Sequence, residues 1–390
     1  MRYGILASAV GLAIALVVVS PASGPLAAQG QRSAGATKAW SGKTAWGDPD
    51  LQGKWETAET ATPMERPKEY ANKEFLTDQE VAARIDAFRK RRAAVANPDD
   101  DTPFPEIKKA AEKSHEKGIR GEEYNKFWVD APEAKIKPWN RTSLIVDPPD
   151  GRMPPFTPEM IKWIEAGEAV RYNRGEADTW EDRNINERCI ENSFTRIGGE
   201  RQILQAPGNV AFIVHHLNAN APFIIPLDGR PKPSDSVRTW MGVARGRWDG
   251  STFVVETTNI NGKQNGGPIL ASRTPYQRFV GAGDTLKITE RFTRVDADTI
   301  EYRYTVDDSK TYVRPYTVLR PLTKADDSLL MPENACHEGN YGIVGQLSAG
   351  RADEAYALKA SRGEQSERKA QFEEMKRRTE EWVRTNGQKR

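Results

Sequence analysis

The chain has 390 residues, of which 37% are apolar, and its 57 Lys and Arg nearly balance its 55 Asp and Glu. This composition excludes a polytopic membrane protein, which needs many long apolar segments, and a strongly basic nucleic-acid-binding protein. With 10 Trp, 11 Tyr and 12 Phe, the chain is also too aromatic to be disordered throughout.

Residues 1–28 have the pattern of a secretory signal peptide. Arg2 is their only charged residue, a continuous apolar run covers residues 5–19, and small residues follow as far as Ala28. This order is typical of a signal peptide, and a run of about 15 apolar residues is shorter than the roughly 20 that span a bilayer. We therefore expect a periplasmic or secreted protein with no stable membrane span after cleavage. An uncleaved anchor is the alternative.

After residue 47 the sequence predicts one strand and then helices. A strand is expected over residues 51–58, following a turn. The capping box Thr77-Asp78-Gln79-Glu80 predicts the start of a helix that continues to about residue 96. A second helix is expected over residues 105–118.

Six prolines between residues 129 and 156 predict an extended segment that wraps around the fold. Thr157, Pro158 and Glu159 then supply an N-cap, a proline at the first helical position and an acid in the first turn. The sequence therefore predicts another helix from here to about residue 172.

Strand-like sequence begins near residue 200. Short turns separate seven β-rich runs, at residues 209–217, 223–227, 237–244, 252–258, 286–293, 299–306 and 311–319. In the run 299–306, Ile300, Tyr302, Tyr304 and Val306 alternate with polar residues, as in a strand with one buried face. Because no helix intervenes, we expect consecutive strands to pair antiparallel.

With the first strand there are about eight strands, enough to close a small barrel. Gly53-Lys54-Trp55 also resembles the Gly-x-Trp opening of lipocalin-like barrels. We therefore predict a mainly β fold with some α: a lipocalin-like antiparallel β-barrel or curved sheet. The expected organisation is a flexible tail at 29–46, a single β-rich domain at 47–350 with a helical and proline-rich insertion at about 59–200, and a charged helical tail at 351–390.

The chain has only two cysteines, Cys189 and Cys336. In an oxidising compartment an even pair is expected to form a disulfide. A free reactive thiol is the alternative. Neither cysteine lies in a C-x-x-C pair, so the signatures of redox and zinc sites are absent from the sequence.

Seven sequence blocks in order carry a resemblance over about residues 48–350. They are PDLQGKW (49–55), VDPPDGR (146–152), WEDR with ERC (180–189), PLDGR (226–230), GRWDG (246–250), ERFTRVD (290–296) and ACHEGNY (335–341). Together they resemble an uncharacterised family of exported bacterial proteins from acidobacteria, sphingomonads and other soil and freshwater bacteria. The resemblance implies no activity. Family members often carry a His in the strand that ends in Glu-Arg-Phe, and residues 285–290 of this chain have none.

The richest chemical cluster surrounds Cys336. A disulfide to Cys189 would hold His337 and Glu338 rigidly and bring them next to Glu187 and Arg188. A neutral imidazole acts as a base near pH 7, a carboxylate orients it, and a guanidinium stabilises an anion. The alternative is a loop that the disulfide pins, in which His337 only caps nearby carbonyls.

His215 and His216 end an apolar run, and neighbouring residues of a strand point to opposite faces. One of them is expected to face the barrel interior, where His215 is a second candidate acid or base. A histidine with a purely structural hydrogen bond is the alternative.

We expect the ligand to contact polar and aromatic residues of the strands and of the loop after Cys336. These residues are Arg291, Glu290, Tyr302, Tyr304, Trp248, Asn340 and Tyr341. Interior charges are costly unless they are paired. Glu290 with an arginine could therefore be a structural pair instead, and the aromatic rings could simply pack the core.

The sequence thus favours an exported protein that binds a small organic molecule, a carbohydrate or a plant-derived aromatic, and transforms it by His and carboxylate acid–base chemistry. A lyase, isomerase or hydrolase would fit. The alternative is a non-catalytic, lipocalin-like binding protein of the periplasm. We expect no cofactor, no metal centre and no nucleic-acid partner, and the oligomeric state stays open.

Overall fold

The computed structural model describes residues 40–93, 136–172, 189, 200–214, 222–261, 284–326, 344, 347–348 and 372–386. All of them belong to one compact unit, Thr37–Arg390, whereas the other compact unit, Met1–Ala36, lies outside the described residues. The signal peptide and the helix expected over residues 105–118 therefore stay predictions.

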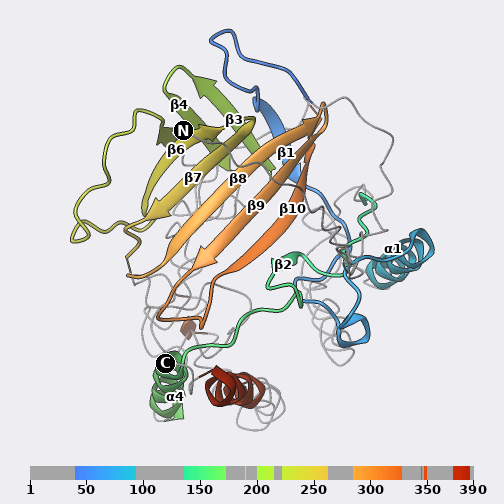
Figure 1. Ribbon diagram of the computed structural model, residues 1–390, viewed down its shortest axis with the longest axis vertical. Coiled ribbons are helices and arrows are strands. Elements are labelled where there is room, and N and C mark those ends of the chain that lie inside the picture. The colour runs from blue at the N-terminus through green and yellow to red at the C-terminus, as the bar shows by residue number, and fades with distance from the viewer. Residues whose placement is uncertain are drawn as a thin grey trace, which may run out of the picture. The chain divides into compact units, whose positions relative to one another are not determined.

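Nine antiparallel strands form a curved sheet that nearly closes into a barrel (Figure 1). Their order is β5-β4-β3-β1-β10-β9-β8-β7-β6, and a tenth strand, β2 (Ile145–Asp147), pairs with β10 off this path. The nine strands are β1 Gly53–Thr57, β3 Glu200–Ala206, β4 Asn209–Val214, β5 Pro222–Pro226, β6 Val243–Asp249, β7 Thr252–Thr258, β8 Lys287–Asp296, β9 Thr299–Asp307 and β10 Tyr316–Lys324. This confirms the predicted mainly β, barrel-like fold class.

The barrel is incomplete between its two terminal strands, β5 and β6. No backbone pairing joins these two strands among the residues that the structure describes. They still pack closely, because a Cβ added to Gly246 would lie only 2.9 Å from Cγ2 of Ile225. Side-chain packing therefore joins β5 and β6 where backbone hydrogen bonds between them are absent among the described residues.

Alternating residues of the strands fill the interior with aromatic rings. In β9, Ile300, Tyr302, Tyr304 and Val306 are buried, as the alternation predicted. The rings of Phe292 and Tyr302 stack with centroids 4.6 Å apart. Such pairs stabilise a core beyond the area that they bury.

Residues 40–51 cover one end of the barrel, which we call the closed end. Leu51 is fully buried, its amide donates to Oε1 of Gln205 (2.7 Å), and its carbonyl accepts from Nε1 of Trp55 (3.0 Å). Trp40 lies within the tail that we expected to be flexible, yet its ring packs against the guanidinium of Arg294. The residues before β1 thus form part of the folded barrel.

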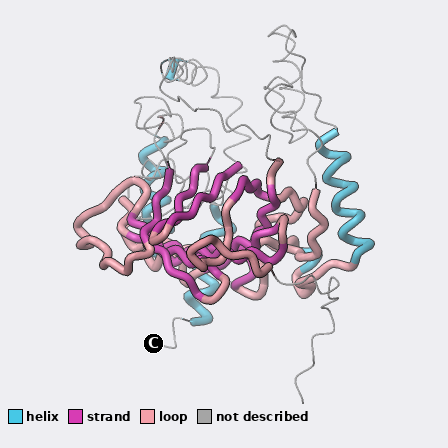
Figure 2. The backbone as a smooth tube through the Cα atoms, turned by 90° about the horizontal axis from the view of Figure 1, so that it is seen from above, coloured by secondary structure: helices cyan, strands magenta, loops and turns pink. Residues whose placement is uncertain are grey.

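The described residues form three long helices, which Figure 2 shows at the margin of the strands. They are α1 (Asp78–Ala93), α4 (Pro158–Tyr172) and a C-terminal helix at residues 372–386, and a short 3-10 helix covers Lys68–Tyr70. The capping box is present, since the amide of Glu80 donates to Oγ1 of Thr77 (3.3 Å) and the amide of Thr77 donates to Oε2 of Glu80 (2.7 Å).

The predicted N-cap of α4 is also present, since Oγ1 of Thr157 accepts from the amide of Met160 (3.1 Å). The C-terminal helix lies within the predicted charged helical tail and packs on the core, with Met375 buried and Phe372 half-buried. Its Lys376 pairs with Glu165 of α4 at 2.7 Å.

Two strand predictions need correction, and two strands were not predicted. The strand expected over 237–244 is wrong for most of its length, because residues 237–242 join the sheet only through the single bridge Thr239–Ile260. The strand expected over 311–319 begins later, since the amides of Thr311 and Tyr312 donate to the carbonyl of Asp308 in a tight turn. Strands β2 and β3 were missed.

Candidate functional site

All five predicted catalytic residues lie outside the described residues. This holds for His337, Glu338, His215, Glu187 and Arg188, and for two of the expected binding residues, Asn340 and Tyr341. The structure therefore leaves their proposed cluster as a prediction.

Cys189 is the only one of the two cysteines that the structure describes. It is not a free thiol, and its φ of 54° lies in the left-handed region. Because Cys336 lies outside the described residues, the Cys189–Cys336 disulfide stays a prediction.

The expected binding residues on the strands divide between the two faces of the barrel. Glu290, Tyr302 and Tyr304 are buried and face the interior, and Trp248 is half-buried beside Phe253, with ring centroids 5.2 Å apart. Arg291 has the opposite orientation and pairs with Asp249 at 2.6 Å. Strand alternation thus separates Arg291 from the other binding candidates.

A buried hydrogen bond joins two of these residues. Oη of Tyr302 donates to Oε1 of Glu290 over 2.7 Å, and both side chains are fully buried. A carboxylate in an apolar interior is costly unless hydrogen bonds satisfy it. The bond therefore holds Glu290 in a fixed place inside the barrel.

Arg320 also belongs to this region and was not among the predicted site residues. It lies directly opposite Tyr302 in the β9–β10 register, on the interior face that Val318 and Leu322 also occupy. The prediction ended the last strand at residue 319, so Arg320 was not placed on any strand. Its alternation with Val318 and Leu322 is the signal that would have revealed it. We call Glu290, Tyr302, Tyr304 and Arg320 the Glu290 cluster.

The tyrosine hydroxyls near this cluster stay protonated at neutral pH. Burial raises the pKa of Tyr304 well above its ordinary value, the charge of Arg320 opposes this rise, and the charge of Glu290 adds to it. Burial likewise raises the pKa of Tyr316, with smaller contributions from Tyr312 and Tyr304. Neutral hydroxyls can donate hydrogen bonds to a ligand.

The aromatic rings that we expected to line a cavity pack against one another. Tyr302 and Tyr304 have ring centroids 5.6 Å apart, and Phe212 and Phe292 have centroids 4.9 Å apart. These contacts stabilise the core at this level of the barrel. A ligand of the interior would therefore have to lie beside this stack.

The last residue of β4 lies at the end of the barrel opposite the closed end. Val214, the last residue of β4, pairs with Arg201, near the start of β3. Because neighbouring strands are antiparallel, these strand termini lie at the end opposite the closed end. The chain continues from Val214 directly into His215.

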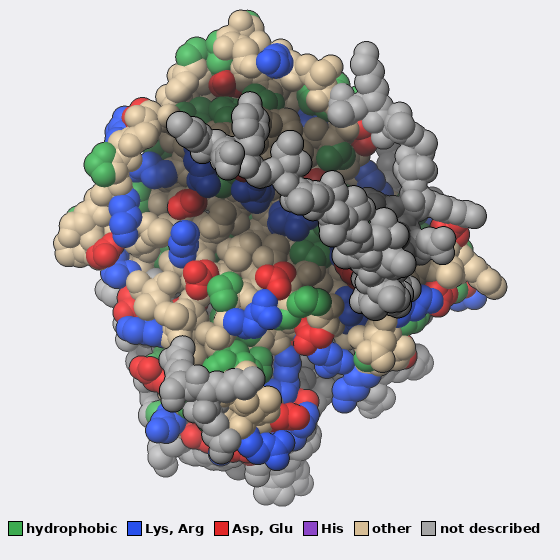
Figure 3. All heavy atoms as spheres, in the orientation of Figure 1, with side chains coloured by type: hydrophobic (Ala, Val, Ile, Leu, Met, Phe, Trp, Pro, Cys, Tyr) green, Lys and Arg blue, Asp and Glu red, His purple; other side chains and the backbone are tan. Residues whose placement is uncertain are grey.

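The outer face of the barrel carries exposed ion pairs. Figure 3 shows Lys and Arg side chains intermixed with Asp and Glu over the face in view. Arg247 pairs with Glu256 at 2.9 Å, and Arg303 pairs with Glu301 at 3.2 Å. Exposed pairs of this kind contribute little to stability.

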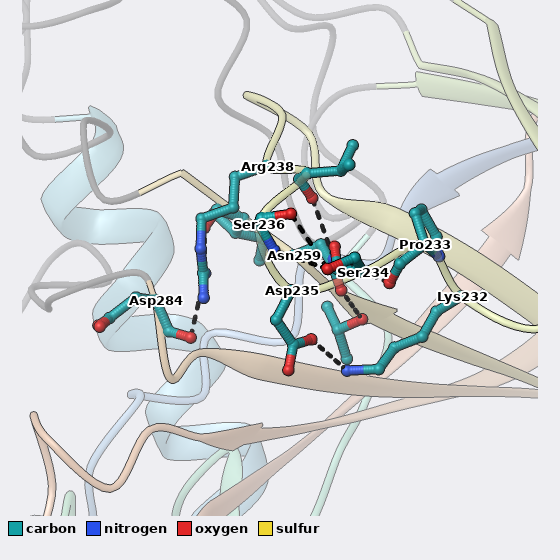
Figure 4. Close-up of polar contacts among 11 residues, drawn as sticks. Lys232, Pro233, Ser234, Asp235, Ser236, Arg238, Asn259 and Asp284 are labelled. Atoms are coloured by element: carbon teal, nitrogen blue, oxygen red, sulfur yellow. Dashed lines mark hydrogen bonds and ion pairs between the residues drawn. The ribbon is translucent and has the colours of Figure 1, made fainter.

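A loop before β6 is fastened to the end of β7 by polar contacts (Figure 4). Nδ2 of Asn259 donates to the carbonyls of Ser234 and Val237, each at 3.0 Å. Nη1 of Arg238 donates to the carbonyls of Ile260 and Asp284, each at 3.1 Å. All four acceptors are backbone carbonyls, so this cluster orders the loop.

No group of three or more His, Cys, Asp or Glu is placed to hold a metal ion within the described part of the chain. No helix in that part is long and apolar enough to cross a membrane.

Fold and interior together define a barrel-like β protein with a buried polar cluster. The chain matches no protein-family model, no curated protein and no solved structure.

Proposed function

We propose that this protein binds a small organic molecule, a carbohydrate or a plant-derived aromatic, inside the barrel next to the Glu290 cluster. The observation that carries the proposal is the buried bond between Tyr302 and Glu290, which fixes a carboxylate beside tyrosine rings. Aromatic faces bind apolar rings and sugar C–H groups, while a fixed carboxylate accepts hydrogen bonds from hydroxyls.

We further propose that the bound molecule is transformed by acid–base chemistry. Val214, the last residue of β4, lies at the end opposite the closed end, and His215 is the next residue in the sequence. In this proposal His337 or His215 is the acid or base, Glu338 orients it, and Arg188 stabilises a developing anion, with Glu187 as a further carboxylate. A non-catalytic carrier is the rival function.

Three other parts of this proposal come from the sequence. The protein is exported to the periplasm or beyond, a Cys189–Cys336 disulfide joins two remote segments, and the chain belongs with the exported bacterial proteins that it resembles. Export and the disulfide support each other, because disulfides persist in oxidising compartments.

The test uses the purified protein and libraries of sugars and plant aromatics. Binding would be measured by thermal shift and calorimetry, and turnover by mass spectrometry of the products. Replacing His337 or His215 with Ala should abolish turnover and retain binding if the protein is an enzyme. Binding without turnover in the unmodified protein supports the carrier. If no compound of either library binds, the proposal is wrong.

Arg303→Gln provides the control variant. Its side chain is 41% exposed on the outer face and pairs only with Glu301 among the described residues. It should leave both binding and turnover unchanged.

A further inference from the structure

Arg320 is an arginine in the interior of the barrel. Its neighbours on the same face of β10, Val318 and Leu322, are 0% exposed, whereas Arg320 itself is only half-buried. The register places it opposite Tyr302, which is also 0% exposed. Solvent therefore reaches part of Arg320, on a face where its neighbours are fully buried.

The described residues give this guanidinium no hydrogen bond and no ion pair within 4.0 Å. The other interior arginines differ. Arg294 donates to three backbone carbonyls, and Nη2 of Arg201 donates to Oγ1 of Thr57 at 2.6 Å. A guanidinium in a partly apolar interior is costly unless an anion or water satisfies it.

The nearest carboxylate of the cluster does not fill this role. Glu290 is engaged by Oη of Tyr302, and it lies beside Tyr304 in the β8–β9 register rather than beside Arg320. The charge of Arg320 nevertheless acts on Tyr304, so the two side chains are near each other. The cluster thus holds a cation on β10, Arg320, and a fixed carboxylate on β8, Glu290. The tyrosine rings of β9 lie between them.

We propose that Arg320 binds the carboxylate of a small aromatic acid at the point where its half-buried side chain meets solvent, beside the tyrosine rings of the Glu290 cluster. A guanidinium binds a carboxylate through two parallel hydrogen bonds, which is stronger and more selective than a bond to a neutral group. Tyrosine rings next to the guanidinium favour an aromatic acid over an aliphatic one. This inference rests on the proposed function and names the ligand class of the same site.

The experiment is calorimetric titration of the whole protein with three probes: 4-hydroxybenzoate, the uncharged 4-hydroxybenzyl alcohol, and glucuronate as a non-aromatic acid. We expect 4-hydroxybenzoate to bind at least about tenfold more tightly than either of the others, since charge-assisted hydrogen bonds exceed neutral ones. Equal binding of the alcohol would overturn the role of the carboxylate, and tighter binding of glucuronate would overturn the aromatic class.

Variants test the residue itself. Arg320→Gln should remove the preference for the acid over the alcohol, Arg320→Lys should keep part of it, and Arg303→Gln on the outer face should keep all of it. If Arg320→Gln does not fold, two other measurements still test the inference. They are the comparison of acid and alcohol binding in the unmodified protein and the titration of Arg320→Lys. A preference that survives in Arg320→Gln overturns the inference.

The two proposals fail separately. If none of the three probes binds while another library compound does, the inference is wrong and the proposed binding function stands. If no compound of any library binds, the proposed function fails as well.

Discussion

The guanidinium carbon of Arg294 lies 5.0 Å from the ring centroid of Trp55, and the ring of Trp40 lies at 3.8 Å from the same carbon. The side chain of Arg294 is only 7% exposed, and its three nitrogens donate to the carbonyls of Asp50, Asp296 and Ala297. Arg294 thus joins β8, β1 and the residues before β1. It fastens the closed end of the barrel.

Replacing Arg294 with Gln should therefore destabilise the protein. We expect the free energy of unfolding to fall by about 2–4 kcal/mol, because cation–π contacts and charge-assisted hydrogen bonds are lost together. Urea unfolding would measure this. Arg303→Gln, an exposed arginine of the next strand, should change it by less than about 1 kcal/mol. Equal effects of the two variants would contradict the role of Arg294.

The buried bond from Tyr302 to Glu290 gives a second prediction. Tyr302→Phe should lower the free energy of unfolding by about 1–3 kcal/mol, because a buried carboxylate loses a donor. Tyr304→Phe is the matched control on the same strand, since the hydroxyl of Tyr304 makes no hydrogen bond among the described residues. Chemical unfolding of both variants decides. Similar losses of unfolding free energy in both variants would show that the bond to Glu290 does not contribute specifically to stability.

The N-terminus of α1 predicts a pH dependence. The hydrogen bond from Lys73, followed by those from Thr77, lowers the pKa of Glu80 from its ordinary 4.5 to about 2. A carboxylate whose pKa is lowered in the folded state stabilises that state above its unfolded pKa, and this stabilisation disappears as the pH falls from about 4.5 to about 2. Folding stability should therefore decrease over this range.

Glu80→Gln isolates this contribution from other carboxylates. Its unfolding midpoint, measured between pH 5 and pH 2, should fall less steeply than that of the unmodified protein, and Lys73→Met should flatten the curve in part. Parallel curves for all three proteins would refute the assignment.

Asn259 offers a prediction about the loop before β6. Its φ is 56°, a region that favours Gly and Asn, and its side chain holds the carbonyls of Ser234 and Val237. Asn259→Ala should cost about 2–3 kcal/mol from strain and lost hydrogen bonds, whereas Asn259→Gly should cost less because strain is absent. Hydrogen exchange at residues 234–238 should accelerate in both. Unchanged exchange would show that another contact orders the loop.

The predicted Cys189–Cys336 disulfide can be tested without any variant. Mass spectrometry of the unreduced protein should find neither cysteine alkylated, and reduction should lower the free energy of unfolding by up to roughly 4–5 kcal/mol, the chain-entropy value for so long a loop. Alkylation of both sulfurs would exclude the bridge, and with it the reason for placing His337 near Arg188.

Local patterns in the sequence predicted much of the fold. The capping box at Thr77 and the N-cap at Thr157 are both present, and each is formed by residues three positions apart in the chain. The alternation in residues 299–306 predicted the buried face of β9 for the same reason. These features depend on contacts within a few residues, which a single sequence displays.

Pairing between distant segments could not be predicted in this way. The sequence gives β3 no clear strand pattern, yet β3 joins β1 to β4. Pro321 disfavours a strand, yet β10 continues through it, since its carbonyl still accepts from the amide of Ala58 (3.1 Å). That continuation is what places Arg320 inside the barrel.

The sequence alone therefore determined the class of fold, the helix starts and the side of β9 that is buried, because each follows from local periodicity and hydrogen bonding. Only the tertiary structure decided that Glu290 meets Tyr302 inside while Arg291 pairs outside, and that Arg320 shares their interior. The physical reason is that strand register, set by pairing across the whole barrel, determines which of two alternating neighbours faces the core.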